Sequence, residues 1–206
     1  IEEKKINPNI EKKIIKILKE NIPTSDGIVV SDFVYGLITP RILKVIIELA
    51  TKYQIPLFGD LQCSSQIGSV TKFKKFTLIC PNEKEARIAL QDKESGLEVI
   101  AQKIIKETNT ANLLMKLSHE GFLVYDCNDK TKILRQSFPA LSVNPLDVTG
   151  AGDSLLAVMA TGMSSKQSIM ISAALACCMA GIAVQNMGNR SIDINQIRDK
   201  LIEILD

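Results

Sequence analysis

Hydrophobic residues follow two alternating patterns along this chain, one with the spacing of an amphipathic helix and one with the continuous apolar run of a buried strand. In IEKKIIKILKEN, residues 10–21, isoleucines and leucines fall three or four positions apart, which predicts a helix. GIVVSDF, residues 27–33, predicts a short strand because its apolar residues are consecutive. Thr39 and Pro40, a cap residue and a first-turn proline, mark the start of the next helix. The same patterns predict helices at 39–53, 82–90, 96–108, 166–187 and 194–205, and strands at 55–61, 77–82, 111–118 and 122–127.

Strands that are separated by helices predict the fold class. Because each strand is a near-continuous apolar run, we expect an α/β protein with three αβα layers, in which helices cover both faces of a mostly parallel sheet. No repeat or change of composition divides the chain, so residues 1–206 are interpreted as one domain. Such sheets bind ligands beyond the carboxyl ends of their strands. Polar or glycine-containing segments follow the predicted strands at 31–33, 59–62, 81–85 and 116–121.

The composition argues against several classes of function. The formal net charge is +2 and no cluster of five or six basic residues occurs, so nucleic acid is not an expected partner. The chain has neither a long apolar run nor the apolar stretch of a signal peptide at its start, and we expect a cytoplasmic protein without membrane contact. With His119 as the only histidine and no Cys-x-x-Cys pair, a zinc site is not expected. Because the chain begins at Ile1 and not at a methionine, we interpret it as a piece of a longer protein.

The stretch NPLDVTGAGDSLLA, residues 144–157, carries the clearest candidate chemistry. Gly150 and Gly152 let the backbone approach a ligand closely, and the first amides of a helix that starts near Ala151 favour an anion. Asp153 adds a carboxylate beside that anion site. The combination suits phosphoryl transfer, because amides stabilise the transferring group while an acid accepts a proton from the attacking hydroxyl. The alternative is that Asp153 and its neighbours only cap a helix.

These glycines do not fit two other nucleotide-binding motifs. A Walker loop needs Gly-Lys-Ser/Thr where this stretch has Gly-Asp-Ser, and a dinucleotide fingerprint needs a glycine where Leu155 stands. DVTGAGDS resembles instead the Asp-Thr-x-Gly-Ala-Gly-Asp signature of the ribokinase, or PfkB-type, carbohydrate kinases. The resemblance implies a ribokinase-like fold in which Asp153 is the catalytic base and the amides of residues 150–152 form the anion hole. The matching residues are Asp147, Gly150, Ala151, Gly152 and Asp153.

PNEKEA resembles the family's Asn-x-x-Glu motif. This resemblance implies that Asn82 and Glu85 order the phosphates of the nucleotide and the water shell of Mg²⁺. A magnesium ion that is held mainly by phosphates and water needs few protein ligands, so one carboxylate is chemically sufficient. Without the other motifs, Glu85 would be interpreted as a solvated acid in the first turn of a helix.

LLMKLSHEGFLVY lies where the family often has Val-Thr-x-Gly-x-x-Gly, a strand and turn beneath the nucleotide. Gly121 matches the second glycine, whereas Lys116 and Ser118 replace the threonine and the first glycine. Two interpretations of Lys116 stay open: a flexible point charge that reaches a phosphate, and a solvent-facing strand end. His119 is interpreted as an exposed turn residue.

AGIAVQNMG resembles the helix end and loop that flank the adenine in this family. The resemblance implies that Asn186 lies near the nucleotide. It also implies that Cys177 lies close to the position where many members carry an Asn or His beside the adenine. ATP is the expected nucleotide, although this chain lacks that Asn or His. Some members use a monovalent cation such as K⁺ at a nearby site. Here that site would comprise Asp147, Thr149, Ala183 and Gly188.

Residues 31–62 are similar to the heptose-phosphate kinase branch, whose pattern is Ser-Asp-Tyr-x-Lys-Gly followed by Val-Asp-Pro-Lys. The loss of both lysines here counts against a phosphorylated sugar as the substrate. The run DLQCSSQIG, residues 60–68, is polar and rich in hydroxyls, which suits either a sugar site or a loop. The matching residues are Ser31, Asp32, Gly36 and Asp60, and the replacing residues are Tyr35, Leu61 and Gln62.

The resemblance covers essentially the whole chain but only the latter two thirds of a typical family member, so the lid and the N-terminal third are expected to be absent from it. We expect ATP-dependent phosphorylation of a hydroxyl on a sugar or sugar phosphate, with ATP and Mg²⁺, and in some members K⁺, as cofactors. Two alternatives stay open: a catalytically silent relative that binds nucleotide and regulates or scaffolds, and a nucleoside or vitamin kinase of the same fold. Dimers in this family often form through the lid, and a homodimer stays an open question.

Overall fold

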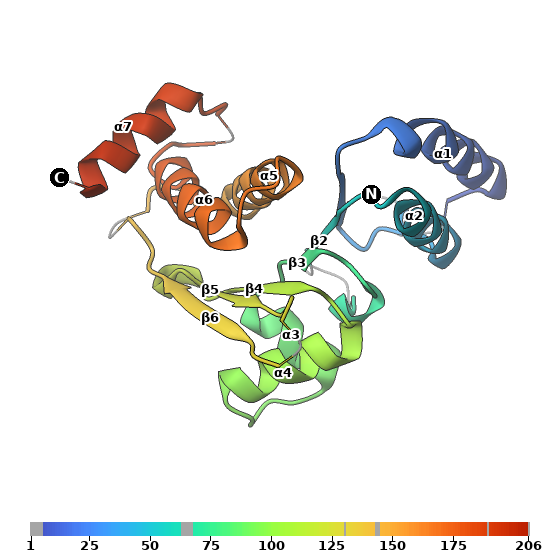
Figure 1. Ribbon diagram of the computed structural model, residues 1–206, viewed down its shortest axis with the longest axis horizontal. Coiled ribbons are helices and arrows are strands. Elements are labelled where there is room, and N and C mark those ends of the chain that lie inside the picture. The colour runs from blue at the N-terminus through green and yellow to red at the C-terminus, as the bar shows by residue number, and fades with distance from the viewer. Residues whose placement is uncertain (1–5, 63–67, 130, 143–144, 189, 206) are drawn as a thin grey trace.

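Helices and strands alternate along the chain, as the hydrophobic pattern predicts (Figure 1). The computed structural model of the protein describes residues 6–62, 68–129, 131–142, 145–188 and 190–205. The helices are α1 (Pro8–Asn21), α2 (Pro40–Tyr53), α3 (Glu83–Leu90), α4 (Leu97–Thr108), α5 (Ala151–Ser164), α6 (Ile169–Ala183) and α7 (Ile194–Leu205). The strands are β1 (Ile28–Asp32), β2 (Leu57–Leu61), β3 (Leu78–Ile79), β4 (Asn112–Lys116), β5 (Phe122–Asp126) and β6 (Leu134–Phe138). Short 3-10 helices are η1 (Ile22–Thr24), η2 (Val70–Lys72) and η3 (Ser118–Glu120).

The strands form one sheet in the order β1-β2-β3-β4-β5-β6. β1 to β4 run parallel to one another, whereas β5 is antiparallel to β4 and β6 is antiparallel to β5. The mostly parallel sheet is confirmed, but the sequence analysis missed β6. Its sequence, LRQSF, has no apolar run, and all of its residues except Phe138 are exposed. β6 forms because an edge strand can be held by its hydrogen-bond ladder with β5 and needs little burial.

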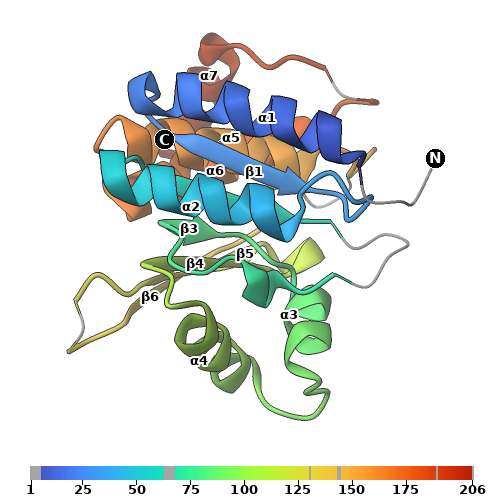
Figure 2. The ribbon, with the colours of Figure 1, turned by 90° about the vertical axis from the view of Figure 1, so that its right-hand side faces the viewer.

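Alternate side chains of the sheet enter two separate cores, which confirms the three αβα layers. In β4, Leu113 and Met115 pack in the cluster that includes α1 to α4, whereas Leu114 between them packs in the cluster with α5 and α6. The two views show α1 and α2 on one side of the sheet and α5 and α6 on the other (Figure 1, Figure 2). α7 lies against the outer side of α6 (Figure 1).

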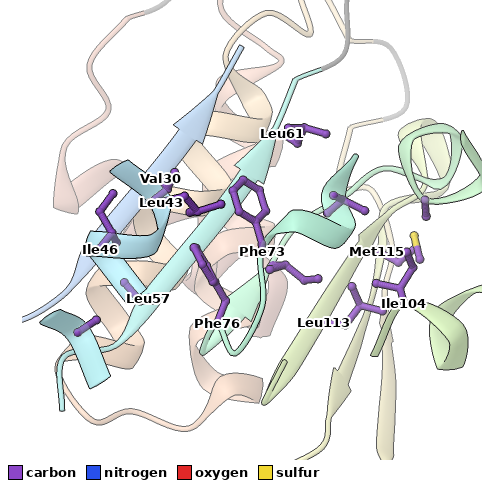
Figure 3. Close-up of a cluster of buried hydrophobic side chains, with 14 of the residues drawn as sticks. Val30, Leu43, Ile46, Leu57, Leu61, Phe73, Phe76, Ile104, Leu113 and Met115 are labelled. Carbon is purple, nitrogen blue, oxygen red and sulfur yellow. The ribbon is translucent and has the colours of Figure 1, made fainter. Parts of the chain in front are cut away.

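Close packing under β2 positions the strand just before its polar end. Phe73 and Phe76 lie against β2 in the cluster of buried side chains shown in Figure 3, with ring centroids 4.9 Å apart. A Cβ atom on Gly59 would stand 3.0 Å from both rings, so a larger residue here would push the rings away from the strand. The strand is therefore fixed immediately before Asp60.

α6 is apolar around most of its circumference, as its sequence predicts, and it packs against both α5 and α7. It ends at Ala183, four residues before the predicted end at 187. Among the helices in the described ranges, none is long and apolar enough to cross a membrane.

Candidate active site

The candidate site is built around the start of α5, where the chain turns from a loop into a helix. Gly150 caps the helix with φ 77°, a left-handed conformation that favours glycine. α5 begins at Ala151, as the sequence predicts, and the exposed Asp153 lies in its first turn. The first amides of a helix have no acceptor within the helix, so those of Gly152 and Asp153 are suited to an anion. The amide of Ala151 differs, because it donates to the carbonyl of Val148 at 3.3 Å.

Gln62, which directly follows β2, contacts the carboxylate of Asp153. Its Nε2 donates a hydrogen bond to Oδ1 of Asp153 at 3.0 Å. The backbone amide of Gln62 donates to the carbonyl of Asp32 at 2.9 Å, which continues the pairing of β1 with β2 beyond the end of β2. This contact therefore links the carboxyl edge of the sheet to the first turn of α5 and restricts a carboxylate that is otherwise exposed.

An ion pair between Asp60 and Lys116 lies at the same edge of the sheet. Nζ of Lys116 is 2.8 Å from each carboxylate oxygen of Asp60, and the amide of Leu61 donates to Oδ1 at 3.0 Å. The side chain of Asp60 is fully buried, whereas 20% of the Lys116 side chain is exposed. Burial raises the pKa of Asp60 to about 6, although the Lys116 ammonium opposes the shift. Burial disfavours the charged form of Lys116, but the Asp60 carboxylate outweighs burial and raises the pKa of Lys116, so both groups are charged at neutral pH.

Gly152 lies directly beside this ion pair. A Cβ atom on Gly152 would be 3.7 Å from Nζ of Lys116 and 3.9 Å from Oδ2 of Asp60. The interpretation of Lys116 as a solvent-facing strand end is therefore wrong, because its side chain is mostly buried between β2 and α5. Its interpretation as a charge that reaches a phosphate stays a prediction, and Asp60 restricts how far the ammonium can move.

Asn82 and Glu85 form the capping box of α3. The amide of Glu85 donates to Oδ1 of Asn82, and the amide of Asn82 donates to Oε2 of Glu85, both at 2.8 Å. Only 4% of Glu85 is exposed, so its interpretation as a solvated acid is wrong. The charge of Glu85 raises the pKa of both Asp60 and Lys116, which places a further carboxylate at this edge of the sheet.

A pocket of about 610 Å³ lies between the β4–β5 connection and the helices α5 and α6. Its walls are mostly apolar, and its size is typical of small-molecule sites. A neighbouring groove reaches Asn82 and shares Lys116 and Ser118 with the pocket. The structure therefore brings together residues that the sequence analysis selected on separate segments. Those lining the pocket are Lys116, Ser118, Gly121, Ala151, Gly152 and Cys177.

Gly121 and Cys177 shape the wall of this pocket. Gly121 has φ 94°, and a Cβ atom there would stand 2.1 Å from the carbonyl oxygen of Phe138, so only glycine fits. The thiol of Cys177 donates to the carbonyl of Pro139 at 3.1 Å, and burial raises its pKa to about 11, which keeps the thiol neutral. His119 is exposed, as expected, but it also lines the pocket, which its turn position did not indicate.

Asp147 ties the loop before α5 to the loop after α6. Its Oδ1 accepts from the amide of Thr149 at 2.9 Å and its Oδ2 accepts from the amide of Gly188 at 3.0 Å. Hydrogen bonds from Thr149 and Gly188 lower the pKa of Asp147, so it is a carboxylate at neutral pH. The carbonyl of Ala183 accepts from the amide of Asn186 at 3.2 Å. Asn186 itself is not among the residues that line the pocket.

A sequence profile of the pfkB family carbohydrate kinases matches residues 7–196, and the chain belongs to that family. Bifunctional protein HldE of Trichlorobacter lovleyi is 32% identical over 191 residues, which are 91% of this chain and 37% of that protein. Bifunctional protein HldE of Sulfurimonas denitrificans is 33% identical over 190 residues, which are 90% of this chain and 38% of that protein. The chain thus spans about two fifths of the length of these curated relatives.

Solved structures share the fold. The chain matches phosphofructokinase-2 from Escherichia coli in complex with potassium with a TM-score of 0.77 and 17% identity, over 98% of this chain and 64% of the other. It matches ribokinase from Arabidopsis thaliana complexed with ribose and ATP with a TM-score of 0.71 and 20% identity, over 96% of this chain and 60% of the other. At these identities the likeness is one of fold, and it confirms the ribokinase-like class.

Some parts of the sequence analysis lie outside the described residues, namely Asn144 and the middle of the hydroxyl-rich run, residues 63–67. Among the described residues, two side-chain pairs were not predicted from the sequence: Asp60 with Lys116, and Gln62 with Asp153. A partial signal was present, because polar side chains at the carboxyl ends of parallel strands gather at one edge of a sheet. Which of them become partners depends on strand order, and the sequence pattern does not contain that order.

Proposed function

We propose that this chain carries the nucleotide-binding and catalytic part of a sugar kinase. A sugar hydroxyl oxygen attacks the γ-phosphorus of MgATP, the bond from that phosphorus to the bridging oxygen of ADP breaks, and Asp153 accepts the hydroxyl proton. The amides of residues 150–152 stabilise the transferred group, for which Ala151 must release the carbonyl of Val148. The observation that carries this proposal is the position of Asp153 in the first turn of α5, in the helix start that lies beside the Lys116 cation and lines the pocket.

The nucleotide is proposed to occupy the 610 Å³ pocket. Its apolar wall, which includes Gly121 and Cys177, would hold the base, and the phosphates would lie toward Lys116 and Gly152, where the pocket meets the start of α5. Ser118 would donate to a phosphate, because it lines both the pocket and the groove that leads to α3. Asn186, which follows α6 outside the pocket lining, is proposed to contact the nucleotide only at the margin of the pocket.

Asn82 and Glu85 are proposed to hold the water shell of Mg²⁺. Their fit rests on chemistry, because Glu85 supplies a buried carboxylate and carboxylate oxygens are ligands that Mg²⁺ prefers. When bound, the ion neutralises phosphate charge during the transfer. Asn82 and Glu85 already fix each other through the capping box, so the carboxylate is oriented before any ligand arrives.

A monovalent cation is proposed to bind beside the loop before α5. Asp147 supplies a carboxylate there, and the backbone carbonyls of Thr149, Ala183 and Gly188 supply further oxygen ligands of the type that hard cations take. The contact between Asp147 and Gly188 supports this assignment, because it joins the two loops that carry these groups. The structural neighbour solved in complex with potassium supports the choice of K⁺.

The acceptor is proposed to be a sugar, because the family consists of carbohydrate kinases and the neighbours include ribokinase complexed with ribose. Lys72 and Lys116, both largely buried, are each paired with an aspartate, Asp32 and Asp60 respectively. Lys72 is therefore not a free charge for a phosphate group on the sugar, and the N–H donor that Asp60 leaves on Lys116 faces the pocket proposed for the nucleotide. This pairing favours an unphosphorylated sugar over the sugar phosphates on which the heptose-phosphate kinase branch acts.

Calorimetric titration with MgATP, repeated with Gly152→Asp, tests the nucleotide site. The new side chain has space, since its Cβ would stand 3.7 Å from Nζ of Lys116, but its charge would occupy the anion site. We expect the unaltered chain to bind MgATP and the variant to bind at least roughly tenfold more weakly. Gly96→Asp is the matched control, because Gly96 caps α4 with open space around it and aspartate is a favoured cap.

The outcomes separate the hypotheses. A loss of binding confined to Gly152→Asp supports the phosphate position, and equal binding by both aspartate variants contradicts it. If the unaltered chain does not bind MgATP, the nucleotide site proposed for this chain is wrong. A screen of sugars, nucleosides and vitamins for phosphorylated product then distinguishes a kinase from a silent relative that binds nucleotide without turnover.

A further inference from the structure

The ion pair of Asp60 and Lys116 holds a cation in place without using all of its hydrogen-bonding capacity. A lysine ammonium has three N–H donors, and the two carboxylate oxygens of Asp60 each lie 2.8 Å from Nζ. One donor is therefore left for another acceptor. Nζ stands 3.7 Å from the Cβ position of Gly152, and part of the side chain is exposed where it lines the pocket.

The charges around Lys116 show why a fixed cation matters at this position. Asp60 and Glu85 are buried carboxylates whose fields both act on Lys116, and Asp153 adds another carboxylate in the first turn of α5. An anionic ligand that approaches this helix start would be repelled by these groups. Lys116 is the cation that offsets their repulsion, and it does so only while its ammonium stays beside Gly152.

We propose that Asp60 is a positioning residue: it holds the ammonium of Lys116 beside Gly152, where the remaining N–H donor binds a phosphoryl oxygen of the nucleotide. This inference rests on the proposed function and adds to it a residue that does not itself touch the nucleotide. A free lysine side chain samples many rotamers, and ordering it before binding removes an entropic cost from the association.

Burial also decides whether the ammonium of Lys116 moves to the phosphate or the phosphate comes to the ammonium. If Lys116 left Asp60 to follow a phosphate, a fully buried carboxylate would lose its cation, which is strongly unfavourable. The ammonium therefore stays on Asp60, and the phosphate comes to the pair. The fixed position of Nζ then selects where along the start of α5 the phosphoryl group lies.

The test compares the affinities for MgATP and for adenosine, which shares the base and ribose but has no phosphate. In Lys116→Met, we expect the Kd of MgATP to rise roughly 10- to 100-fold, the effect of losing a charged hydrogen bond, while the Kd of adenosine stays within about twofold. In Asp60→Asn the lysine remains but is no longer held, so the Kd of MgATP should rise by a smaller factor. A purely structural role of the pair would weaken both ligands alike.

The double variant Asp60→Asn with Lys116→Met makes the inference specific. If Asp60 acts only through Lys116, the preference for MgATP over adenosine should be no lower in the double variant than in Lys116→Met alone. It also leaves no buried charge unpaired, so its comparison with Asp60→Asn still carries the test should Lys116→Met not fold. Lys72→Met is the matched control, because it breaks the pair with Asp32 on η2 and β1, away from the pocket lining.

The possible results support or overturn the inference. The inference is supported if Asp60→Asn lowers the preference for MgATP over adenosine and Lys72→Met does not. It also requires that the double variant has no lower preference than Lys116→Met alone. An unchanged preference in Asp60→Asn, or additive effects of the two substitutions, overturns the positioning role while leaving the proposed function intact. An unaltered chain that binds neither ligand overturns both.

Discussion

Nε2 of Gln62 donates a hydrogen bond to Oδ1 of Asp153 at 3.0 Å, although the two residues are 91 positions apart in the chain. Gln62 follows β2 and Asp153 lies in the first turn of α5, so the contact joins the edge of the sheet to the proposed catalytic base. Because a glutamine is neutral, it can orient the carboxylate without forming an ion pair that would compete with the proton from the substrate.

Gln62→Ala should therefore lower kcat by about fivefold, the value of one exposed hydrogen bond to a charged group, and leave the KM for MgATP unchanged. Steady-state kinetics with the acceptor found in the sugar screen measures both constants. Gln102→Ala, at an exposed position of α4, should change neither. A raised KM with an unaltered kcat would show that Gln62 acts on the nucleotide and not on Asp153.

Asp153→Asn should lower kcat roughly 10²- to 10⁴-fold, the usual effect of removing a positioned acid or base. Binding of MgATP should persist, because the amides at the start of α5 and the Lys116 cation remain. Turnover and calorimetric titration of the same preparation check the two expectations. Asp199→Asn, an exposed aspartate on α7, is the control for a general effect of charge. Full turnover by Asp153→Asn would contradict the assignment of the base.

Lys116→Met should reduce the free energy of unfolding by about 3–5 kcal/mol, because it leaves the buried carboxylate of Asp60 without its cation. Adding Asp60→Asn should recover most of this loss, since an amide carries no charge to bury. Urea denaturation of the single and double variants measures the difference. Lys44→Met breaks an exposed pair with Glu48 and should cost less than about 1 kcal/mol. Equal losses in the single and double variants would show that the pair is not coupled.

The stability should also depend on pH through Asp60. Burial raises its pKa from 3.8 to about 6, so between these values the folded state binds the proton more tightly than the unfolded state does. The stability that this proton contributes is fully present below pH 3.8 and is lost as the pH rises through 6, in total about 3 kcal/mol. Urea denaturation between pH 4 and 7 should show this decline relative to Asp60→Asn, which cannot titrate. Parallel curves for the two proteins would mean that Asp60 titrates normally.

Gly121→Ala should destabilise the protein by at least about 3 kcal/mol or prevent folding, because the new Cβ would meet the backbone of Phe138 at 2.1 Å and the residue has φ 94°. Thermal denaturation measures the effect. Gly96→Ala is the control, since a Cβ there has nothing within 4 Å, and it should cost less than about 1 kcal/mol. A mild effect at Gly121 would mean that the turn between β4 and β5 can rearrange.

Local patterns in the sequence predicted most of the fold. The helical spacing of apolar residues located α1, α2 and α4, and continuous apolar runs located β1 to β5. Thr39 caps α2 as expected, with its Oγ1 accepting from the amide of Ile42 at 3.2 Å. β6 was missed because it is exposed and held by pairing, which leaves no periodic signal in LRQSF. For Glu85, the resemblance had outweighed the alternative of a solvated first-turn acid, and the packing of α3, which buries this residue, contradicts that alternative.

The sequence by itself determined the class of this protein and the position of its candidate catalytic segment, because helix periodicity, apolar runs and the Gly-Ala-Gly-Asp motif are local properties. Only the tertiary structure decided which side chains meet there. Asp60 and Lys116 are 56 positions apart and pair because β2, β3 and β4 are neighbours with their carboxyl ends at one edge. Gln62 reaches Asp153 because α5 packs on that sheet. Partnerships of this kind depend on strand order and packing, which arise when the whole chain buries its apolar faces.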